Sequence, residues 1–286
     1  MDFTLYWFMF PVAMCVATLA MLSGIGGAAL FTPIFILIFP LLGPEYPLQS
    51  TVAAIGTALL TETFGFTSGF IGYYRRKLID FAIVRRFIVV SIPVAVLGAF
   101  LAPYVPEALL IGGYAVLVLA IAAIHLFVSH DAEGQPQTGA QELIDSEGNV
   151  YRYPPPMLKS KDVISTGIGS FLTGMVSVGI GEVIVPQLTK RGVPVEVAVA
   201  ASVAIVIVTV ACASFTLIGQ VVREGGVNAM PWHLVCYSIP GVLIGGQIGP
   251  RLQGKVSQRA MEYGIAILFV VLAIAMFMVA SQRGIH

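Results

Sequence analysis

Charged residues are scarce in this chain of 286 residues. Lys, Arg, Asp and Glu make up 10% of it, whereas hydrophobic residues make up 57%. Soluble globular domains contain about 25% charged residues, so this chain has too few charges to cover a surface that faces water. The 15 basic and 15 acidic residues balance, which gives no composition-level case for nucleic acid as a partner. We therefore expect the lipid bilayer to be the solvent.

Cysteine and histidine are also rare, and their positions exclude several kinds of site. The three cysteines, Cys15, Cys212 and Cys236, lie in apolar runs and form neither a C-x-x-C motif nor a Cys/His ligand set. We interpret them as packing residues and predict no metal site and no cofactor. Ser68 and Ser170 resemble hydrolase nucleophiles only vaguely, because the four histidines lie near segment ends and supply no base. We predict that the protein is not an enzyme.

Long apolar segments dominate the chain. A hydrocarbon core about 30 Å thick requires about 20 apolar residues per helix. Six stretches meet or nearly meet this length: Leu48–Tyr74, Phe81–Leu101, Ala108–Val128, Val195–Gln220, Trp232–Ile248 and Met261–Ala280. The N-terminal run, Phe3–Leu22, lacks a basic flank and a clean cleavage site, so we interpret it as a retained first membrane helix.

Glycine clusters interrupt two further apolar regions. The first cluster is Ser23-Gly24-Ile25-Gly26-Gly27, and the second is Ser177-Val178-Gly179-Ile180-Gly181. Glycine inside a helix costs about 1 kcal/mol relative to alanine, so each cluster predicts a break. Broken helices are tolerated at membrane depth only where they face protein or a watery cavity.

A polar segment, residues 130–161, divides the chain almost in half. It carries several charges and ends in Pro154-Pro155-Pro156. It shows no apolar periodicity, and we predict a mobile, cytoplasmic polar linker. It would separate a first transmembrane repeat, residues 1–129, from a second, residues 162–286.

The two halves contain similar motifs in the same order, which predicts an internal repeat. The glycine clusters are each followed by a proline, Pro33 and Pro186. The matching motifs downstream are 54–58 with 198–202, Ser91-Ile92-Pro93 with Ser238-Ile239-Pro240, and Gly98 and Pro103 with Gly245 and Pro250.

The basic residues predict that the two repeats have opposite orientations, because cytoplasmic loops collect Lys and Arg. In the first half the loop region 75–86 is basic, and the next loop, 103–106, is not. In the second half this bias is reversed. The loop that corresponds to 75–86 holds only Arg223, whereas the loop that corresponds to 103–106 holds Arg251, Lys255 and Arg259. The predicted fold class is an all-α polytopic membrane protein of two inverted-topology repeats, each a glycine-broken helical hairpin plus three transmembrane helices. We expect both termini outside the cytoplasmic membrane and the linker inside.

The paired glycine motifs, the A-I-G-T-A segment at 54–58 and the basic loop resemble the TauE/SafE family of sulfite exporters and sulfonate-associated permeases. The resemblance covers nearly all the chain except the linker. It departs from the common pattern at Glu182, a place often taken by glycine, and at Ala200-Ala201-Ser202, where Gly-Thr-Ser is common. The resemblance implies export of sulfite or a small organosulfonate.

The residues themselves indicate how an anion would be bound. No Lys or Arg is near the predicted mid-membrane depth, so binding would depend on backbone N–H groups at helix N-termini. Inverted-repeat transporters place their site at such broken helices. The candidate substrate-binding residues are Ser23, Gly24, Gly26, Gly27, Ala28, Thr57, Ser177, Gly179, Gly181 and Ser202.

Two acidic residues are candidates for coupling transport to H⁺ or Na⁺. Glu62 falls near the centre of its apolar segment, where a charge costs at least ~2.5 kcal/mol by insertion scales. Glu182 follows the second glycine cluster, where the helix dipole would stabilise a carboxylate, so a structural role is equally consistent with its position.

Two other classes remain as alternatives to a carrier. Re-entrant hairpins also build channels, so an anion channel, or an importer of another small oxyanion such as thiosulfate, is the main alternative. A membrane scaffold would explain neither Glu62 nor the paired breaks.

Overall fold

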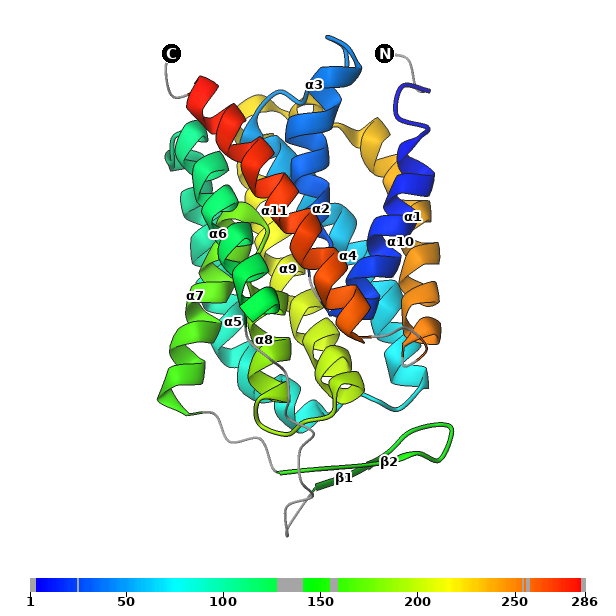
Figure 1. The fold of residues 1–286 in the computed structure, drawn as a ribbon. Coiled ribbons are helices and arrows are strands. Elements are labelled where there is room, and N and C mark those ends of the chain that lie inside the picture. The colour runs from blue at the N-terminus through cyan, green and yellow to red at the C-terminus, as the bar shows by residue number, and fades with distance from the viewer. Residues whose placement is uncertain are drawn as a thin grey trace.

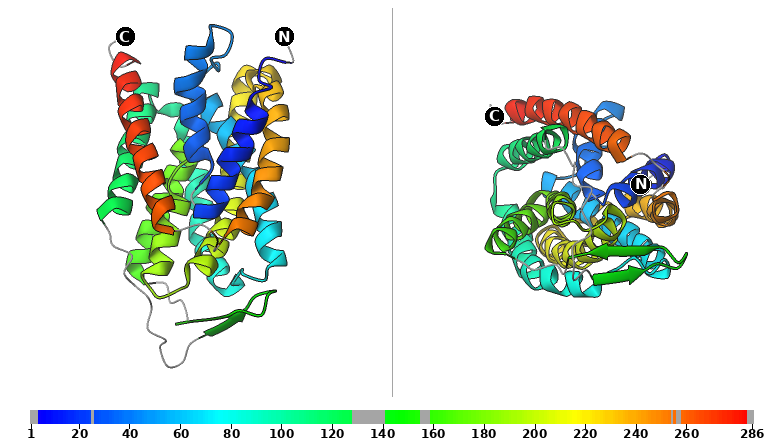
Figure 2. Two further views of the ribbon diagram at one scale, coloured as in Figure 1. Left: turned by 45° about the vertical axis from the view of Figure 1, so that its right-hand side comes forward. Right: turned by 60° about the horizontal axis from the view of Figure 1, so that its bottom comes forward.

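The computed structural model describes residues 4–24, 26–127, 141–154, 159–253, 255 and 258–283. These residues form a bundle of helices that run approximately along one common direction (Figures 1 and 2). Both termini lie at one end of the bundle, and a short β-hairpin lies at the other. We call these the terminal end and the hairpin end.

The first half contains α1 and a returning segment, followed by three long helices. The elements are α1 (Met9–Ser23), α2 (Ala28–Pro33), the π-helical turn η1 (Ile34–Ile38), α3 (Phe39–Leu42), α4 (Thr51–Arg75), α5 (Phe81–Leu101), the 3₁₀ turn η2 (Ala102–Tyr104) and α6 (Glu107–Phe127).

The second half has its helices in a similar order, but its returning segment is a single helix and its 3₁₀ turn follows the first of the three long helices instead of the second. Its elements are α7 (Ser160–Val176), α8 (Ile180–Thr189), α9 (Val195–Gly225), the 3₁₀ turn η3 (Val227–Ala229), α10 (Trp232–Leu252) and α11 (Gln258–Arg283).

All six long helices predicted from the apolar segments are present. Their starts differ by a few residues where a cap sets the boundary. For example, α4 begins at Thr51 instead of Leu48 because the Ser50 side chain accepts a hydrogen bond from Ala53 N at 3.1 Å. Three of the described helices are long and apolar enough to cross a membrane: Phe81–Tyr104, Val195–Gly225 and Tyr263–Gln282. The chain is therefore a helical membrane protein.

Both predicted helix breaks are present. α1 ends at Ser23, and Gly24 adopts a left-handed conformation with φ of 69°. α7 ends at Val176, and Ser177 adopts the same conformation with φ of 67°. In each half the chain then begins a new helix that returns toward the end from which it came (Figure 1). Left-handed residues are common where helices end, so each break is a true terminus and not a kink.

The long helices of one half pack mainly against those of the other half. α1 packs on α10, and α7 packs on α5; α4 packs on α10, and α5 packs on α9. α4 also packs on α9, and α6 packs on α11. The core therefore lies between the halves, and neither half forms a separate bundle.

Part of the predicted linker, residues 141–153, has regular structure that was not predicted from the sequence. They form an antiparallel hairpin of β1 (Gln141–Ile144) and β2 (Val150–Tyr153), with Gln141 opposite Tyr153 and Ile144 opposite Val150. The Asp145 carboxylate organises the turn by accepting hydrogen bonds from Glu147 N at 2.8 Å and Asn149 N at 2.9 Å. Such local bonds favour turns. Residues 130–140 and 155–158 of the expected linker lie outside the described residues.

Candidate functional site

The two helix breaks meet in the interior of the bundle. The hydroxyl groups of Thr32 on α2 and Ser177 after α7 are 2.6 Å apart, and both side chains are buried. The Ser202 hydroxyl on α9 donates to Gly24 O at 3.0 Å. Each break therefore contacts an element of the opposite half.

Two buried carboxyl groups face each other at this junction. Glu62 on α4 is 2% exposed, and Glu182 on α8 is 6% exposed. A Cβ atom added to Gly26 would lie 3.0 Å from Glu62 Oε1 and 3.6 Å from Glu182 Oε1. A methyl group at this position would thus contact both carboxyl groups. The position is open because residue 26 is glycine and has no side chain.

The carboxyl groups differ in their hydrogen bonds. Glu182 Oε2 accepts from Gly179 N at 2.9 Å, at the start of α8, while its Oε1 has no hydrogen-bond partner among the described residues. The backbone amides of Gly27 and Ala28 lie near the Glu62 carboxyl group. Neither oxygen of Glu62, however, has a hydrogen-bond partner of good geometry among the described residues. Burial of a carboxyl group with so few partners is costly, so Glu62 is an unusual residue for a purely structural position.

The glycines of the two clusters have different surroundings. Gly24 packs against Val185 and Val199, where an added Cβ would lie 2.9 and 3.2 Å from their side chains. Gly179 has a φ of 144° and packs against the carbonyl of Gly169. Gly181 and Ala28 are buried in the first turns of α8 and α2. Gly26 is therefore the cluster residue that lies between the carboxyl groups.

The four candidate hydroxyl groups make different hydrogen bonds. Ser23 Oγ donates to Leu19 O at 2.9 Å, and Thr57 Oγ1 donates to Ala53 O at 2.7 Å. These bonds lie within their own helices, as is common for Ser and Thr in membrane helices. Ser177 and Ser202, in contrast, connect the halves.

Three buried side chains at the junction were not among the residues predicted from the sequence. Thr32 pairs with Ser177, Thr173 Oγ1 accepts from Ile180 N at 2.7 Å, and the Tyr114 hydroxyl donates to Ala29 O. Thr32 lies in the apolar run after the first glycine cluster, and Tyr114 follows Gly112 and Gly113 in a long apolar segment. Neither position is charged, and neither lies within a predicted break. Thr173 lies four residues before Ser177, and this spacing to the break is the one sequence feature that could have indicated its contact with the start of α8.

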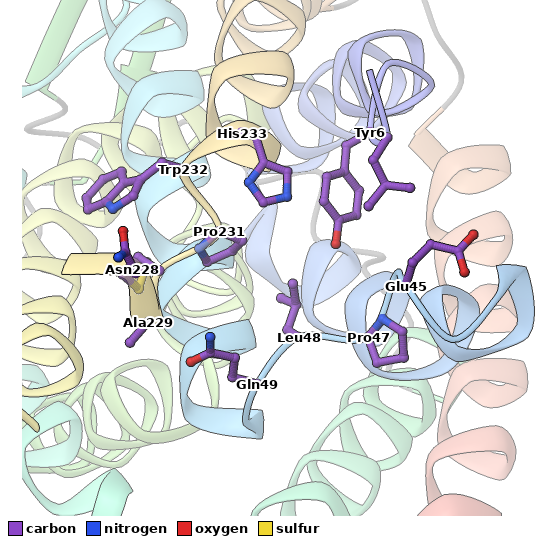
Figure 3. A pocket seen from close by; sticks show the side chains of 12 residues that line it. Tyr6, Glu45, Pro47, Leu48, Gln49, Asn228, Ala229, Pro231, Trp232 and His233 are labelled. Carbon is purple, nitrogen blue, oxygen red and sulfur yellow. The ribbon is translucent and has the colours of Figure 1, made fainter. Parts of the chain in front are cut away.

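A cavity of about 610 Å³ opens at the terminal end (Figure 3). The Tyr6 and His233 rings face each other in its wall, with centroids 4.9 Å apart, and the amides of Gln49 and Asn228 also line it. A smaller cavity of about 200 Å³ shares Pro47, Leu48 and Gln49 with it and is also lined by Ala54 of α4, the helix that carries Glu62.

Broken helices that meet at polar groups inside a bundle are the arrangement by which membrane transporters bind small solutes, and the fold and the junction place this chain in that class. Comparison with known families gives the same class: the model of the family "Sulfite exporter TauE/SafE" matches residues 9–276. The chain belongs to the TauE/SafE family.

A relative in Bacillus subtilis (strain 168), "Probable membrane transporter protein YjnA", is 26% identical to this chain over 266 residues. The match covers 90% of this chain and 93% of the relative. No solved structure matches the chain.

Membership of a transporter family agrees with the prediction that the protein is not an enzyme. The two serines that were considered as nucleophiles have structural bonds instead. Ser68 Oγ donates to Leu243 O at 2.6 Å, and Ser170 Oγ donates to Thr166 O at 2.7 Å.

Proposed function

We propose that this protein is a secondary transporter that moves a small sulfur-containing anion, sulfite or an organosulfonate, out across the cytoplasmic membrane. The site would lie at the junction of the two helix breaks and would open to each side in turn. The observation that carries the proposal is the meeting of Glu62 and Glu182, one from each half, across Gly26. The description of the family, sulfite exporter, supports the substrate class.

The helix pairings support an inverted repeat. When each element is exchanged for its counterpart in the other half, the contact of α1 with α10 becomes that of α7 with α5, and the contact of α4 with α10 becomes that of α9 with α5. The contacts of α4 with α9 and of α6 with α11 are unchanged. This is the behaviour of two copies related by a two-fold axis, the plan of many alternating-access carriers.

Matching glycines support the same relation. An added Cβ on Gly98 of α5 would lie 2.2 Å from Phe171 O of α7, and one on Gly245 of α10 would lie 2.3 Å from Met14 O of α1. Both glycines therefore let a long helix cross the first helix of the opposite half at close range. Their shared role agrees with their matched positions in the sequence.

The charges support an orientation with the hairpin end in the cytoplasm. Of the 15 Lys and Arg residues, Arg223 and Arg283 belong to the ends of α9 and α11 at the terminal end. The other 13 lie in the hairpin or in helix ends and loops toward the hairpin end. By the rule that cytoplasmic loops are basic, both termini would be outside.

Backbone amides at the two breaks would bind the anion, because the basic residues lie away from the junction. α8 presents its first N–H groups at the junction, and free N–H groups at a helix start bind anions. In this structure Gly179 N donates to the Glu182 carboxylate, and Ile180 N donates to Thr173 Oγ1. An anionic substrate would therefore bind together with H⁺ or Na⁺ that neutralises Glu62 and Glu182, which couples its movement to a cation gradient.

The direct test is a thermal-shift screen of the purified protein against sulfite, thiosulfate, small organosulfonates and small carboxylates. We expect saturable stabilisation by sulfite or a sulfonate, because a ligand that binds only the folded state raises its stability. Stabilisation by carboxylates alone, or by none of these anions, would reject the proposed substrate class.

A further inference from the structure

The β1–β2 hairpin lies across the hairpin end of the bundle (Figure 1), and the view from that end shows it over the helices that begin and end there (Figure 2). Tyr153 at the end of β2 is only 1% exposed. Leu143 and Tyr151 pack against the hydrophobic core. The hairpin is thus seated on the bundle and does not extend freely from it.

Two hydrogen bonds attach the hairpin to the first half. Ser146 N in its turn donates to Arg76 O, after α4, at 3.0 Å. The Tyr153 hydroxyl donates to Asp80 Oδ2 at 2.9 Å, and both side chains are buried. Asp80 also caps α5 through its other oxygen, which accepts from Ala82 N at 2.8 Å. The hairpin therefore binds the segment that turns α4 into α5.

The hairpin also contacts the second half. Pro154 lies against Gly192 in the turn between α8 and α9, since a Cβ added to Gly192 would be 3.6 Å from Pro154 Cδ. Burial, and then the neighbouring Glu196 carboxylate in the first turn of α9, raises the pKa of Tyr151. Arg76, whose carbonyl accepts from Ser146 of the hairpin, also donates through its guanidinium to Pro250 O of α10. The hairpin and Pro154, the residue that follows it, thus lie against segments of both halves.

The described cavities lie at the other end of the molecule, where Leu48 lines both of them. Opening of an alternating-access carrier to the cytoplasm requires the inner ends of its halves to separate. The hairpin contacts both halves. Its contacts with at least one half would have to break before the two halves could separate. We propose that the β1–β2 hairpin is the cytoplasmic gate, and that the Tyr153 to Asp80 hydrogen bond keeps it closed while the outer side is open. This inference rests on the proposed transport function.

The first test uses Tyr153→Phe, which removes the hydroxyl and keeps the ring. Two single-cysteine reporters are introduced after replacement of Cys15, Cys212 and Cys236: Val193→Cys, buried beside Gly192, and Leu48→Cys in the outer cavities. Labelling by a membrane-impermeant maleimide is measured from each side. Loss of a hydrogen bond to a charged group shifts an equilibrium by about tenfold or more, so Tyr153→Phe is expected to raise Val193→Cys labelling about tenfold and to lower Leu48→Cys labelling.

The matched control is Tyr104→Phe, at an exposed tyrosine of the terminal end, which should change neither reporter. The decisive result is the decrease in labelling of Leu48→Cys. A hairpin that only covered the cytoplasmic surface would not change the accessibility of a residue on the outer side. A rise at Val193→Cys with unchanged Leu48→Cys labelling would overturn the gate, as would no change at either position.

A second test locks the hairpin in place. Arg76→Cys and Ser146→Cys are joined by a short bismaleimide, whose thioether bonds sulfite does not cleave. We expect sulfite flux in proteoliposomes to fall at least tenfold on cross-linking; equal flux before and after would overturn the gate. Flux of the uncross-linked variant reports on the transport function itself, while cysteine labelling needs no substrate, so failure of the gate and failure of the proposed function give different results.

Discussion

At the scale of single residues, the proposed site depends on Gly26, which has no side chain. Its neighbour Gly27 is a natural comparison, because an added Cβ there would make only an ordinary contact of 3.4 Å with Ala20. At Gly26 the added methyl group would be 3.0 Å from Glu62 Oε1 and would occupy the position between the two carboxyl groups.

We predict that Gly26→Ala lowers anion affinity at least tenfold, because the methyl group fills the position where the substrate or coupling ion would bind. Gly27→Ala should retain affinity within a few-fold. Anion titrations followed by thermal shift measure both variants. Equal affinities in the two variants would show that the position between Glu62 and Glu182 is not part of the site.

A second residue-scale prediction concerns the turn of the hairpin. Burial alone would raise the pKa of Asp145, but hydrogen bonds from Asn149 and Glu147, together with nearby Arg76, lower it overall from 3.8. Because the pKa is lower in the folded turn than in the unfolded chain, the ionised carboxylate stabilises the turn at pH values above the ordinary pKa. This contribution is lost as the pH falls below it.

We therefore expect hydrogen-exchange protection of the Glu147 and Asn149 amides, corrected for intrinsic rates, to fall below about pH 4. Asp145→Asn serves as the control and should have low protection with little pH dependence. Constant protection of the unmodified turn down to pH 2 would contradict the assigned role of the Asp145 carboxylate.

At the scale of elements, close helix crossings hold the two halves together. Gly98→Ala and Gly245→Ala would each drive a methyl group into the backbone of a helix from the opposite half, and overpacking of this kind costs about 1–3 kcal/mol. Gly113 of α6 has nothing within 4 Å of an added Cβ. Gly113→Ala should be neutral or should stabilise by up to about 1 kcal/mol.

Thermal unfolding in detergent measures all three variants. Similar losses of stability at Gly98 and Gly245 are expected if the crossings are equivalent. A large loss at one glycine and none at the other would contradict an equivalent role in the two halves.

Elements differ in how well the sequence predicts them. The six long helices could be predicted because membrane helices need long apolar runs, and both breaks could be predicted because glycine clusters disfavour helix interiors. The β1–β2 hairpin could not, because its stability depends on Asp145 bonds in the turn and on tertiary contacts such as Tyr153 with Asp80.

The site could be predicted only in part. Glu62, Glu182 and the glycines were identifiable as unusual residues at membrane depth. Their meeting depends on how two distant helices pack, and so does the contact of Thr32 with Ser177. The sequence also could not show that the Thr57 and Ser23 hydroxyl groups donate to carbonyls of their own helices; their part in the site stays a prediction.

At the scale of the whole molecule, charge and shape indicate the same polarity. Thirteen of the 15 Lys and Arg residues and the seated hairpin lie toward one end, while the described cavities lie at the other. The buried junction of the two breaks lies between them. In the proposed orientation, the described cavities would open to the outside and the hairpin would lie on the cytoplasmic side.

The most direct test of the central claim is sulfite flux in proteoliposomes that contain either the unmodified protein or Glu62→Gln, with proton or sodium gradients imposed at a fixed external pH. If the two facing carboxyl groups couple anion movement to a cation, flux of the unmodified protein will be saturable and will respond to one of the gradients. Glu62→Gln will lose that response. Flux of Glu62→Gln with unchanged dependence on both gradients would contradict the account.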